Sequence, residues 1–184
     1  LYVHQETAIR KFLSGRNLVV STGTGSGKTE SFLVPIINSL LEERSAGTLG
    51  PGVRALLLYP MNALANDQLK RLRSVLQSCP DITFGRYTGE TLMKSSDAEN
   101  DFLQNNPGDR LLPNELLSRD EMRATPPNLL LTNYAMLEYL LIRPADIDLF
   151  DGPHAGTYRF IVMDEAHVYD GAQGSEVALL LRRL

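Results

Sequence analysis

The sequence predicts an α/β protein built on an open, mostly parallel β-sheet with helices on both faces. Two observations support this prediction: short apolar runs that have the character of strands, and helical patterns that alternate with them along the chain. Most of the runs are continuously apolar rather than alternating, which is typical of strands covered on both faces. Strands that alternate with helices are joined by right-handed crossovers, and such sheets bind ligands at the carboxyl ends of their strands.

The expected elements follow in chain order. Strands are predicted at residues 17–21, 54–59, 82–86, 128–132 and 159–163. Helices are predicted at residues 5–14, 28–43 and 63–77, with Asn62 as the N-cap of the third.

The polar stretch 91–127 is far longer than an ordinary connection, so we interpret it as an insertion. Within it, Ser118 and Glu121 predict a capping box at the start of one short helix. That helix is expected to end near Ala124, before the proline pair at 126–127.

Length and composition indicate one ordinary globular domain. The chain has 184 residues, of which 43% are hydrophobic and 22% charged, and this excludes disordered, collagenous and coiled-coil proteins. Its single cysteine, Cys79, excludes an internal disulfide, and three scattered histidines exclude a zinc cluster at ligand spacing. We therefore expect a reducing, cytoplasmic or nuclear setting.

Charge and chain ends add further expectations. No apolar run approaches the ~20 residues of a membrane span, so no membrane partner is expected. The formal net charge of −4 excludes a broadly basic surface, so a polyanion must be held locally. The chain starts at Leu1 rather than Met and stops at Leu184 inside an apolar and basic run, which suggests part of a longer protein.

A glycine-rich loop at residues 21–29 lies between the first expected strand and the following helix. Its glycines let backbone N–H groups turn toward phosphate oxygens, Lys28 can reach the β and γ phosphates, and the Thr29 hydroxyl can bind Mg²⁺. This is a Walker A loop with Thr22 where the strict pattern has Gly. A structural glycine-rich turn is the alternative, but it does not need the Gly-Lys-Thr ending. The residues expected to bind the phosphates of ATP are Thr22, Gly23, Thr24, Gly25, Ser26, Gly27, Lys28 and Thr29.

The last expected strand leads into the sequence Asp-Glu-Ala-His at residues 164–167. Asp164 can hold Mg²⁺, and Glu165 can accept a proton from the water that attacks the γ phosphate. His167 is expected beside the phosphates as a coupling residue. Alone, such a pair of carboxylates is more often a solvated strand end. Together with the Walker A loop it predicts ATP hydrolysis, with Lys28, Asp164 and Glu165 as the catalytic residues.

In this order, the motifs resemble the first motor lobe of superfamily 2 helicases of the DEAD/DEAH type. Further stretches share the likeness: Tyr-x-His-Gln ending at Gln5, and residues 60–68, 86–91 and 132–138. With residues 164–178, they look most like the bacterial YprA/MrfA-like, Lhr-related DNA helicases, which carry a C-terminal domain of unknown function. The resemblance implies a RecA-like P-loop NTPase lobe over residues 1–184.

The resemblance also implies roles for individual residues and partners. Gln5 would read adenine, and ATP with Mg²⁺ would power 3′ to 5′ translocation on single-stranded DNA, in repair or phage defence. A second RecA-like lobe of the same chain would complete the motor, so the isolated lobe is expected to be nearly inactive. The implied nucleic-acid contacts are Asn62, Thr88, Gly89, Thr132 and Asn133.

Several other interpretations stay open at this point. An RNA helicase or a restriction-type translocase shares this lobe. A nucleotide-dependent scaffold without hydrolysis is disfavoured by the intact residues Lys28, Thr29, Asp164 and Glu165. A small-molecule kinase would not be expected to show this motif order.

Overall fold

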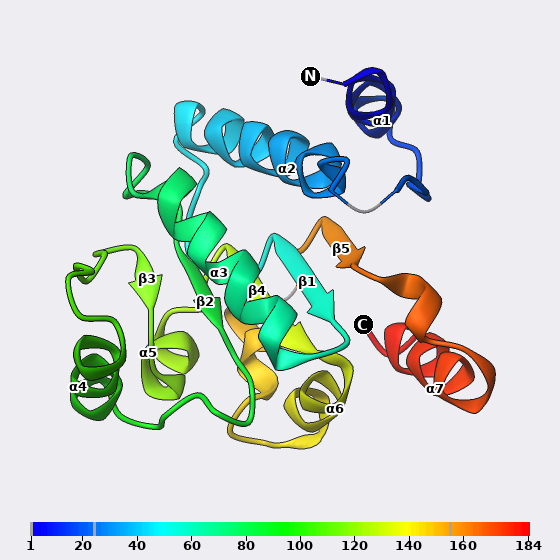
Figure 1. Cartoon of the computed structure of the whole chain (residues 1–184). Helices are drawn as coiled ribbons and strands as arrows, with labels where there is room; N and C mark the ends of the chain where they lie inside the picture. The colour runs from blue at the N-terminus through cyan, green and yellow to red at the C-terminus, as the bar shows by residue number, and fades with distance from the viewer. Residues whose placement is uncertain (1, 24, 155) are drawn as a thin grey trace. The chain divides into compact units, whose positions relative to one another are not determined.

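The computed structural model describes residues 2–23, 25–154 and 156–184 (Figure 1). The chain divides into two compact units, Leu1–Leu49 and Gly50–Leu184. Among the described helices, none combines the length and apolarity that a membrane crossing requires.

The first unit consists of two helices that contact each other, α1 (Val3–Leu13) and α2 (Lys28–Ser45). Both predicted helices are confirmed, although α1 begins two residues earlier than expected and α2 ends two residues later. The segment that joins them contains the phosphate loop, which leads directly into α2.

The strand predicted at residues 17–21 is not formed, and this prediction was wrong. These residues have no regular secondary structure, and the side chain of Val19 is 97% exposed. A strand needs a neighbour to satisfy its backbone N–H and C=O groups, and the described part of the first unit contains no other strand. Apolar sequence alone was therefore not enough to specify a strand.

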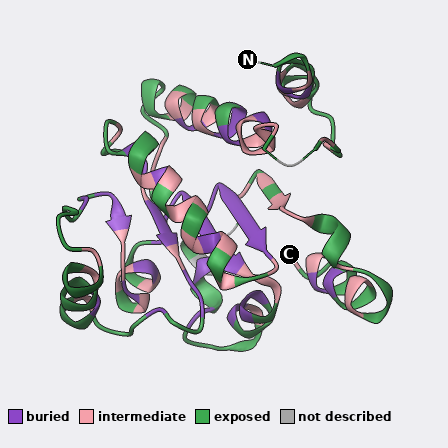
Figure 2. Cartoon of the chain, viewed as in Figure 1, coloured by how far each residue is buried: buried purple, intermediate pink, exposed green. Residues whose placement is uncertain are grey.

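The second unit is built on a five-stranded sheet with strand order β3-β2-β4-β1-β5, in which every paired strand is parallel. The four remaining predicted strands are confirmed within two residues. The strands are β1 (Ala55–Tyr59), β2 (Phe84–Arg86), β3 (Glu115–Leu116), β4 (Leu129–Asn133) and β5 (Phe160–Met163). Figure 2 shows β1 buried along its whole length, as the continuous apolar runs predict.

Helices cover both faces of this sheet, which confirms the predicted fold class. The longest, α3, packs against β1, β2 and β4, and α6 packs against β4. The helices of this unit are α3 (Asn62–Leu76), α4 (Ser95–Asn105), α5 (Arg119–Ala124), α6 (Tyr134–Ile142) and α7 (Gly171–Leu181), with short 3₁₀ turns η1 (Ile147–Leu149), η2 (Gly152–His154) and η3 (Ala166–Val168).

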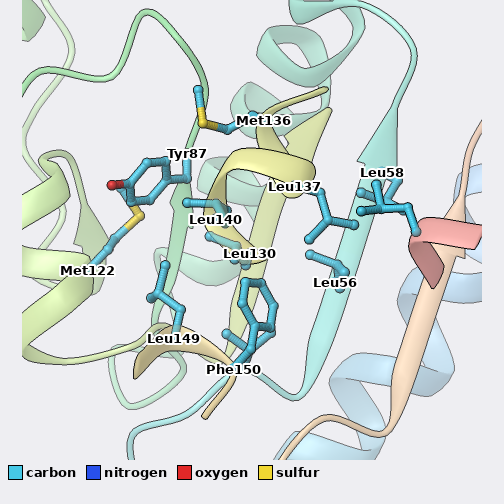
Figure 3. Close-up of a cluster of buried hydrophobic side chains, with 12 residues drawn as sticks. Leu56, Leu58, Tyr87, Met122, Leu130, Met136, Leu137, Leu140, Leu149 and Phe150 are labelled. Atoms are coloured by element: carbon cyan, nitrogen blue, oxygen red, sulfur yellow. The ribbon is translucent and has the colours of Figure 1, made fainter. Parts of the chain in front are cut away.

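The core beneath α6 is drawn in Figure 3. Leu56 of β1 and Leu130 of β4 pack with Leu137 and Leu140 of α6, and these side chains are essentially buried. Alternate residues of a strand point to opposite faces, so Leu57 points to the other side of the sheet, which α3 covers. Two buried layers therefore hold the carboxyl ends of the strands in place.

The predicted N-cap at Asn62 was wrong. Met61 is the N-cap residue of α3, and Asn62 is the first helical residue. The side chain of Asn62 instead bonds to partners from distant parts of the chain, which are described below. The capping box of α5 is confirmed: the Ser118 hydroxyl accepts a hydrogen bond from the Glu121 N–H at 3.2 Å.

The stretch 91–127 contains more structure than the one predicted helix. It also forms α4 and the two-residue strand β3, which extends the sheet beside β2. The buried side chain of Asn114 donates hydrogen bonds to three carbonyl oxygens, those of Leu76, Cys79 and Ile82. The sequence missed these elements because two residues are too few for a periodic pattern, and α4 is largely polar.

Candidate functional site

The phosphate loop has the backbone geometry that an anion site requires. Gly25 and Gly27 have φ angles of +74° and +76°, a region that residues with a Cβ rarely adopt. Nothing lies within 4 Å of the position that a Cβ would take at Gly23 or Gly25, so a phosphate can approach the backbone there. The hydroxyls of Thr22 and Ser26 are 2.6 Å apart and tie the loop across its width. Thr24 lies outside the described residues.

Lys28 and Thr29 are the first two residues of α2, directly after Gly27. The first N–H groups of an α-helix have no partner within the helix, and the N-terminus of this 18-residue helix carries a partial positive charge. The side chains of Lys28 and Thr29 therefore extend from residues at the helix end that attracts anions. These residues fit the triphosphate and Mg²⁺ expected from the sequence.

Gln5 of α1 is attached to this loop. Its side-chain nitrogen donates a hydrogen bond of 2.8 Å to the carbonyl oxygen of Gly27, and its side-chain oxygen accepts one from the N–H of Tyr2. The φ of +76° favours glycine at residue 27, and a Cβ there would lie 2.5 Å from that nitrogen, so the Gln5 side chain would have to shift. Gln5 thus links the position of the loop to α1.

The acidic motif begins where β5 ends. The N–H of Asp164 donates to the carbonyl oxygen of Leu58 in β1, so the strand pairing continues into the first acidic residue. Among the described non-glycine residues, Glu165 alone has a positive φ, 49°. Its N–H donates to the carboxylate of Asp164 at 2.9 Å. Left-handed backbone at a non-glycine residue is uncommon and concentrates at functional sites.

His167 and two tyrosines lie near the carboxylates of this motif. His167 Nδ1 lies 3.4 Å from a carboxylate oxygen of Glu165, and its side chain is mostly exposed. The rings of Tyr134 and Tyr169 meet edge to face, with centroids 5.9 Å apart. Burial, with smaller contributions from Tyr134 and Asp164, raises the pKa of Tyr169 to about 12, so its phenol stays neutral beside the carboxylates.

A chain of polar side chains connects three of the motifs that follow strands. Asn133, at the end of β4, donates a hydrogen bond of 2.9 Å to the side-chain oxygen of Asn62, at the start of α3. Asn62 in turn donates to Glu90 at 3.0 Å. Arg86, the last residue of β2, donates to Glu90 at 2.9 Å and also to Asn66. Asn62 and Asn133, both predicted as nucleic-acid contacts, are therefore brought together.

The two predicted threonines are placed differently from the asparagines. Thr88 and Thr132 are fully buried. The Thr132 hydroxyl donates to the carbonyl oxygen of Tyr87 at 2.7 Å, and the Thr88 hydroxyl accepts from the N–H of Glu90 at 3.3 Å. Both hydroxyls thus support the loop after β2 from inside, whereas Gly89 is exposed on it.

Sequence reasoning missed Glu90 and Arg119 as residues of this edge. Glu90 lies in a stretch already compared with a strand-gripping motif, but a carboxylate gave no reason to expect a role near a polyanion. Arg119, from the stretch 91–127, donates to the carbonyl oxygens of Thr88, Gly89 and Thr91. Nothing local in the sequence signals that contact.

Comparisons with known proteins identify a family and individual relatives. The family model described as DEAD/DEAH box helicase matches residues 2–184. The Druantia protein DruE of Escherichia coli is 35% identical across the whole chain, and YprA of Bacillus subtilis, an uncharacterized ATP-dependent helicase, is 29% identical. The chain spans 15% and 20% of the lengths of these two relatives.

A solved structure is similar as well. The crystal structure of the DUF1998 helicase MrfA bound to DNA and AMPPNP matches 99% of the chain, with a TM-score of 0.69 and 28% identity. The chain covers 21% of that protein.

Proposed function

This chain belongs to the DEAD/DEAH box helicase family, and on that premise we propose that it is the ATP-binding motor lobe of a helicase or translocase that acts on single-stranded DNA. The proposal rests above all on one observation. The carboxyl edge of one sheet presents both the acidic motif after β5 and the polar chain Asn133–Asn62–Glu90. Ligands of open parallel sheets bind at this edge.

The nucleotide part of the proposal assigns a task to each motif. The phosphate loop, residues 22–29, binds the phosphates of ATP through backbone N–H groups, and Lys28 neutralises charge on the β and γ phosphates. Thr29 and Asp164 are the residues that would hold Mg²⁺, which would supply positive charge to offset the charge on the phosphates. Gln5 would bind adenine, and its hydrogen bond to Gly27 would link adenine binding to the phosphate loop.

Glu165 is the proposed base for hydrolysis. Its carboxylate would accept a proton from the attacking water, while the backbone at Glu165 is fixed by the bond to Asp164. His167, 3.4 Å from Glu165, would couple the state of the nucleotide to the nucleic acid. In this scheme Lys28, Asp164 and Glu165 are the catalytic residues.

The proposed strand contacts come from amides and backbone rather than from a basic surface. Asn62, Asn133 and Gly89 would meet phosphates, with Thr88 and Thr132 holding the loop behind them. This arrangement suits a chain of net charge −4 and predicts a grip without base preference. DNA is preferred over RNA because the similar structure of MrfA is bound to DNA.

We further propose that a second RecA-like lobe completes the motor in a longer, cytoplasmic protein. Phosphoryl transfer in related phosphate-loop enzymes gains roughly 10³ to 10⁵ in rate from an arginine finger. That factor corresponds to about 4 to 7 kcal/mol of barrier at ~1.4 kcal/mol per tenfold. Glu165 can activate water but cannot neutralise the γ phosphate oxygens, so this lobe alone should turn over very slowly.

The deciding experiment is a steady-state ATPase assay, with and without single-stranded DNA, on the 184-residue chain and on the full-length protein that contains it. We expect slow, DNA-insensitive hydrolysis from the chain and DNA-stimulated hydrolysis from the full-length protein. Comparable DNA-stimulated rates from both would mean that this lobe holds a complete catalytic site, and the two-lobe proposal would be wrong. Stimulation by RNA alone would overturn the choice of DNA.

A further inference from the structure

The loop that follows β2 has its carbonyl oxygens occupied from inside the protein. Thr91 donates its hydroxyl to the carbonyl oxygen of Arg86 at 2.8 Å and accepts from the N–H of Thr88. The guanidinium of Arg119 donates to three more carbonyl oxygens: to Thr91 at 2.8 Å, to Thr88 at 3.2 Å and to Gly89 at 3.3 Å. One side chain thus holds the loop at three points.

These bonds set the direction of the neighbouring N–H groups. A trans peptide is planar, and its N–H points opposite to its C=O. Because the carbonyl oxygen of Thr88 faces Arg119, the N–H of Gly89 in the same peptide faces away from it. Among the hydrogen bonds of the described residues, that N–H donates none, and open space surrounds the position of a Cβ at Gly89.

A second tie joins the same helix to the strand side of the loop. The Tyr87 hydroxyl donates to the buried carboxylate of Asp146 at 2.5 Å, and Arg123 of α5 donates to the same oxygen at 2.7 Å. Arg119 also lies over the Tyr87 ring, with its guanidinium carbon 5.4 Å from the ring centroid. Helix α5 therefore grips both Tyr87 and the residues that follow it.

We propose that Arg119 is a positioning residue for nucleic-acid binding, and that α5 of the stretch 91–127 serves to preorganise the loop 88–90. By occupying the carbonyl oxygens, Arg119 keeps them away from the phosphate backbone and presents the N–H of Gly89 to a phosphate. Because the donor is already fixed, binding avoids the conformational-entropy cost of ordering a mobile loop. This inference rests on the proposed function, since it concerns the same nucleic-acid edge.

Arg119 could instead be a direct phosphate contact, and two variants separate the roles. Lysine keeps the positive charge but is a single ammonium and cannot reproduce the planar fork that spans three carbonyl oxygens. A positioning role therefore predicts that Arg119→Lys and Arg119→Ala lose similar affinity. A direct contact predicts that lysine retains binding and that alanine lowers the salt slope by about one unit.

The experiment measures binding of a fluorescein-labelled oligothymidylate by the full-length protein over a series of KCl concentrations. We expect both variants to bind about tenfold more weakly, as for the loss of one well-placed hydrogen bond to a charged group. The salt slope and the affinity for an ATP analogue should match the unmutated protein. Arg110→Ala is the matched control, because Arg110 lies in the same stretch and its guanidinium reaches Gln77 rather than the loop.

Three results would overturn the proposal: binding by Arg119→Lys equal to the unmutated protein, a salt slope lowered in Arg119→Ala, or an equal loss in Arg110→Ala. Loss of nucleotide affinity together with DNA affinity would show general unfolding and would also count against it. Failure of the unmutated protein to bind the oligonucleotide at all would instead refute the proposed function, and this inference with it.

Discussion

Asn133 and Asn62, which are 71 residues apart in the sequence, are joined by a hydrogen bond of 2.9 Å between their side chains. Asn133 also caps α6, because its side-chain oxygen accepts from the N–H of Met136 at 2.7 Å. One amide thus fixes the start of α6 with its oxygen and reaches the start of α3 with its nitrogen. Two helix N-termini, each favourable for a phosphate, are held together at the carboxyl edge of the sheet.

Replacing Asn62 by alanine should weaken binding of single-stranded DNA. The change removes an amide proposed to contact a phosphate, together with the bonds to Asn133 and Glu90 that hold this amide in place. One hydrogen bond contributes about 0.5 to 1.5 kcal/mol, so a three- to tenfold loss is expected at roughly 1.4 kcal/mol per tenfold. Fluorescence anisotropy with labelled oligonucleotides of different sequence measures it, and nucleotide affinity should not change. Asn105→Ala, at an exposed α4 position whose side chain bonds to Asp101 of the same helix, is the control. Equal affinities of Asn62→Ala and the control variant would contradict the role of this edge.

Replacing Lys28 by alanine should weaken ATP binding and turnover together. Lys28 stands at the N-terminus of α2 beside two glycines with positive φ, and its ammonium is the expected partner of the β and γ phosphates. Isothermal titration calorimetry with ATP and Mg²⁺ should show at least a tenfold weaker affinity, the order expected for one lost charge-assisted contact. Lys11→Ala, at an exposed position on α1, removes the same charge from the same unit and should bind ATP with unchanged affinity. Unchanged binding in Lys28→Ala would remove the basis for a phosphate loop here.

Replacing Glu165 by glutamine should separate binding from hydrolysis. The amide is isosteric with the carboxylate but cannot accept a proton, so ATP affinity should persist while turnover falls by roughly 10² to 10⁴. The comparison is made in the full-length protein, with steady-state ATPase rates beside the affinity for an ATP analogue. A rate close to that of the unmutated protein would exclude Glu165 as the general base. A parallel fall in affinity would point to nucleotide binding instead.

Tyr87 should make the second unit sensitive to alkaline pH. Burial, followed by the hydrogen bond to Asp146, raises the pKa of Tyr87 from 10.0 to about 12. Between these values the unfolded chain releases the phenolic proton and the folded chain retains it, so this contribution to stability is complete below pH 10 and is lost as the pH rises toward 12.

Urea unfolding at a series of pH values checks this prediction. The free energy of unfolding should fall more steeply in the unmutated protein than in Tyr87→Phe, by at most about 1.4 kcal/mol per pH unit for one group. Tyr139→Phe, at an exposed position on α6, is a control that should keep the steep slope. Parallel curves for the unmutated protein and Tyr87→Phe would show that folding does not raise the pKa of this phenol.

Local patterns in the sequence by themselves determined much of the fold. Continuous apolar runs identified four of the five strands, and the capping box at Ser118 identified α5 correctly. The glycines of the phosphate loop and the acidic residues after β5 were found from spacing alone. These signals are local, because a cap, a tight turn or a buried strand is specified by residues that are neighbours in the sequence.

The tertiary structure decided the features that depend on distant partners. Residues 17–21 are apolar enough for a strand but have no paired neighbour among the described residues of their unit. Asn62 looked like a cap, yet its side chain binds Asn133 and Glu90, and Thr132 looked like a contact, yet its hydroxyl is used inside the protein. The register of the sheet and the stretch 91–127 bring these groups together. The sequence alone therefore identified residues whose side chains are able to bind or react. Long-range packing determined which of these side chains reach the surface.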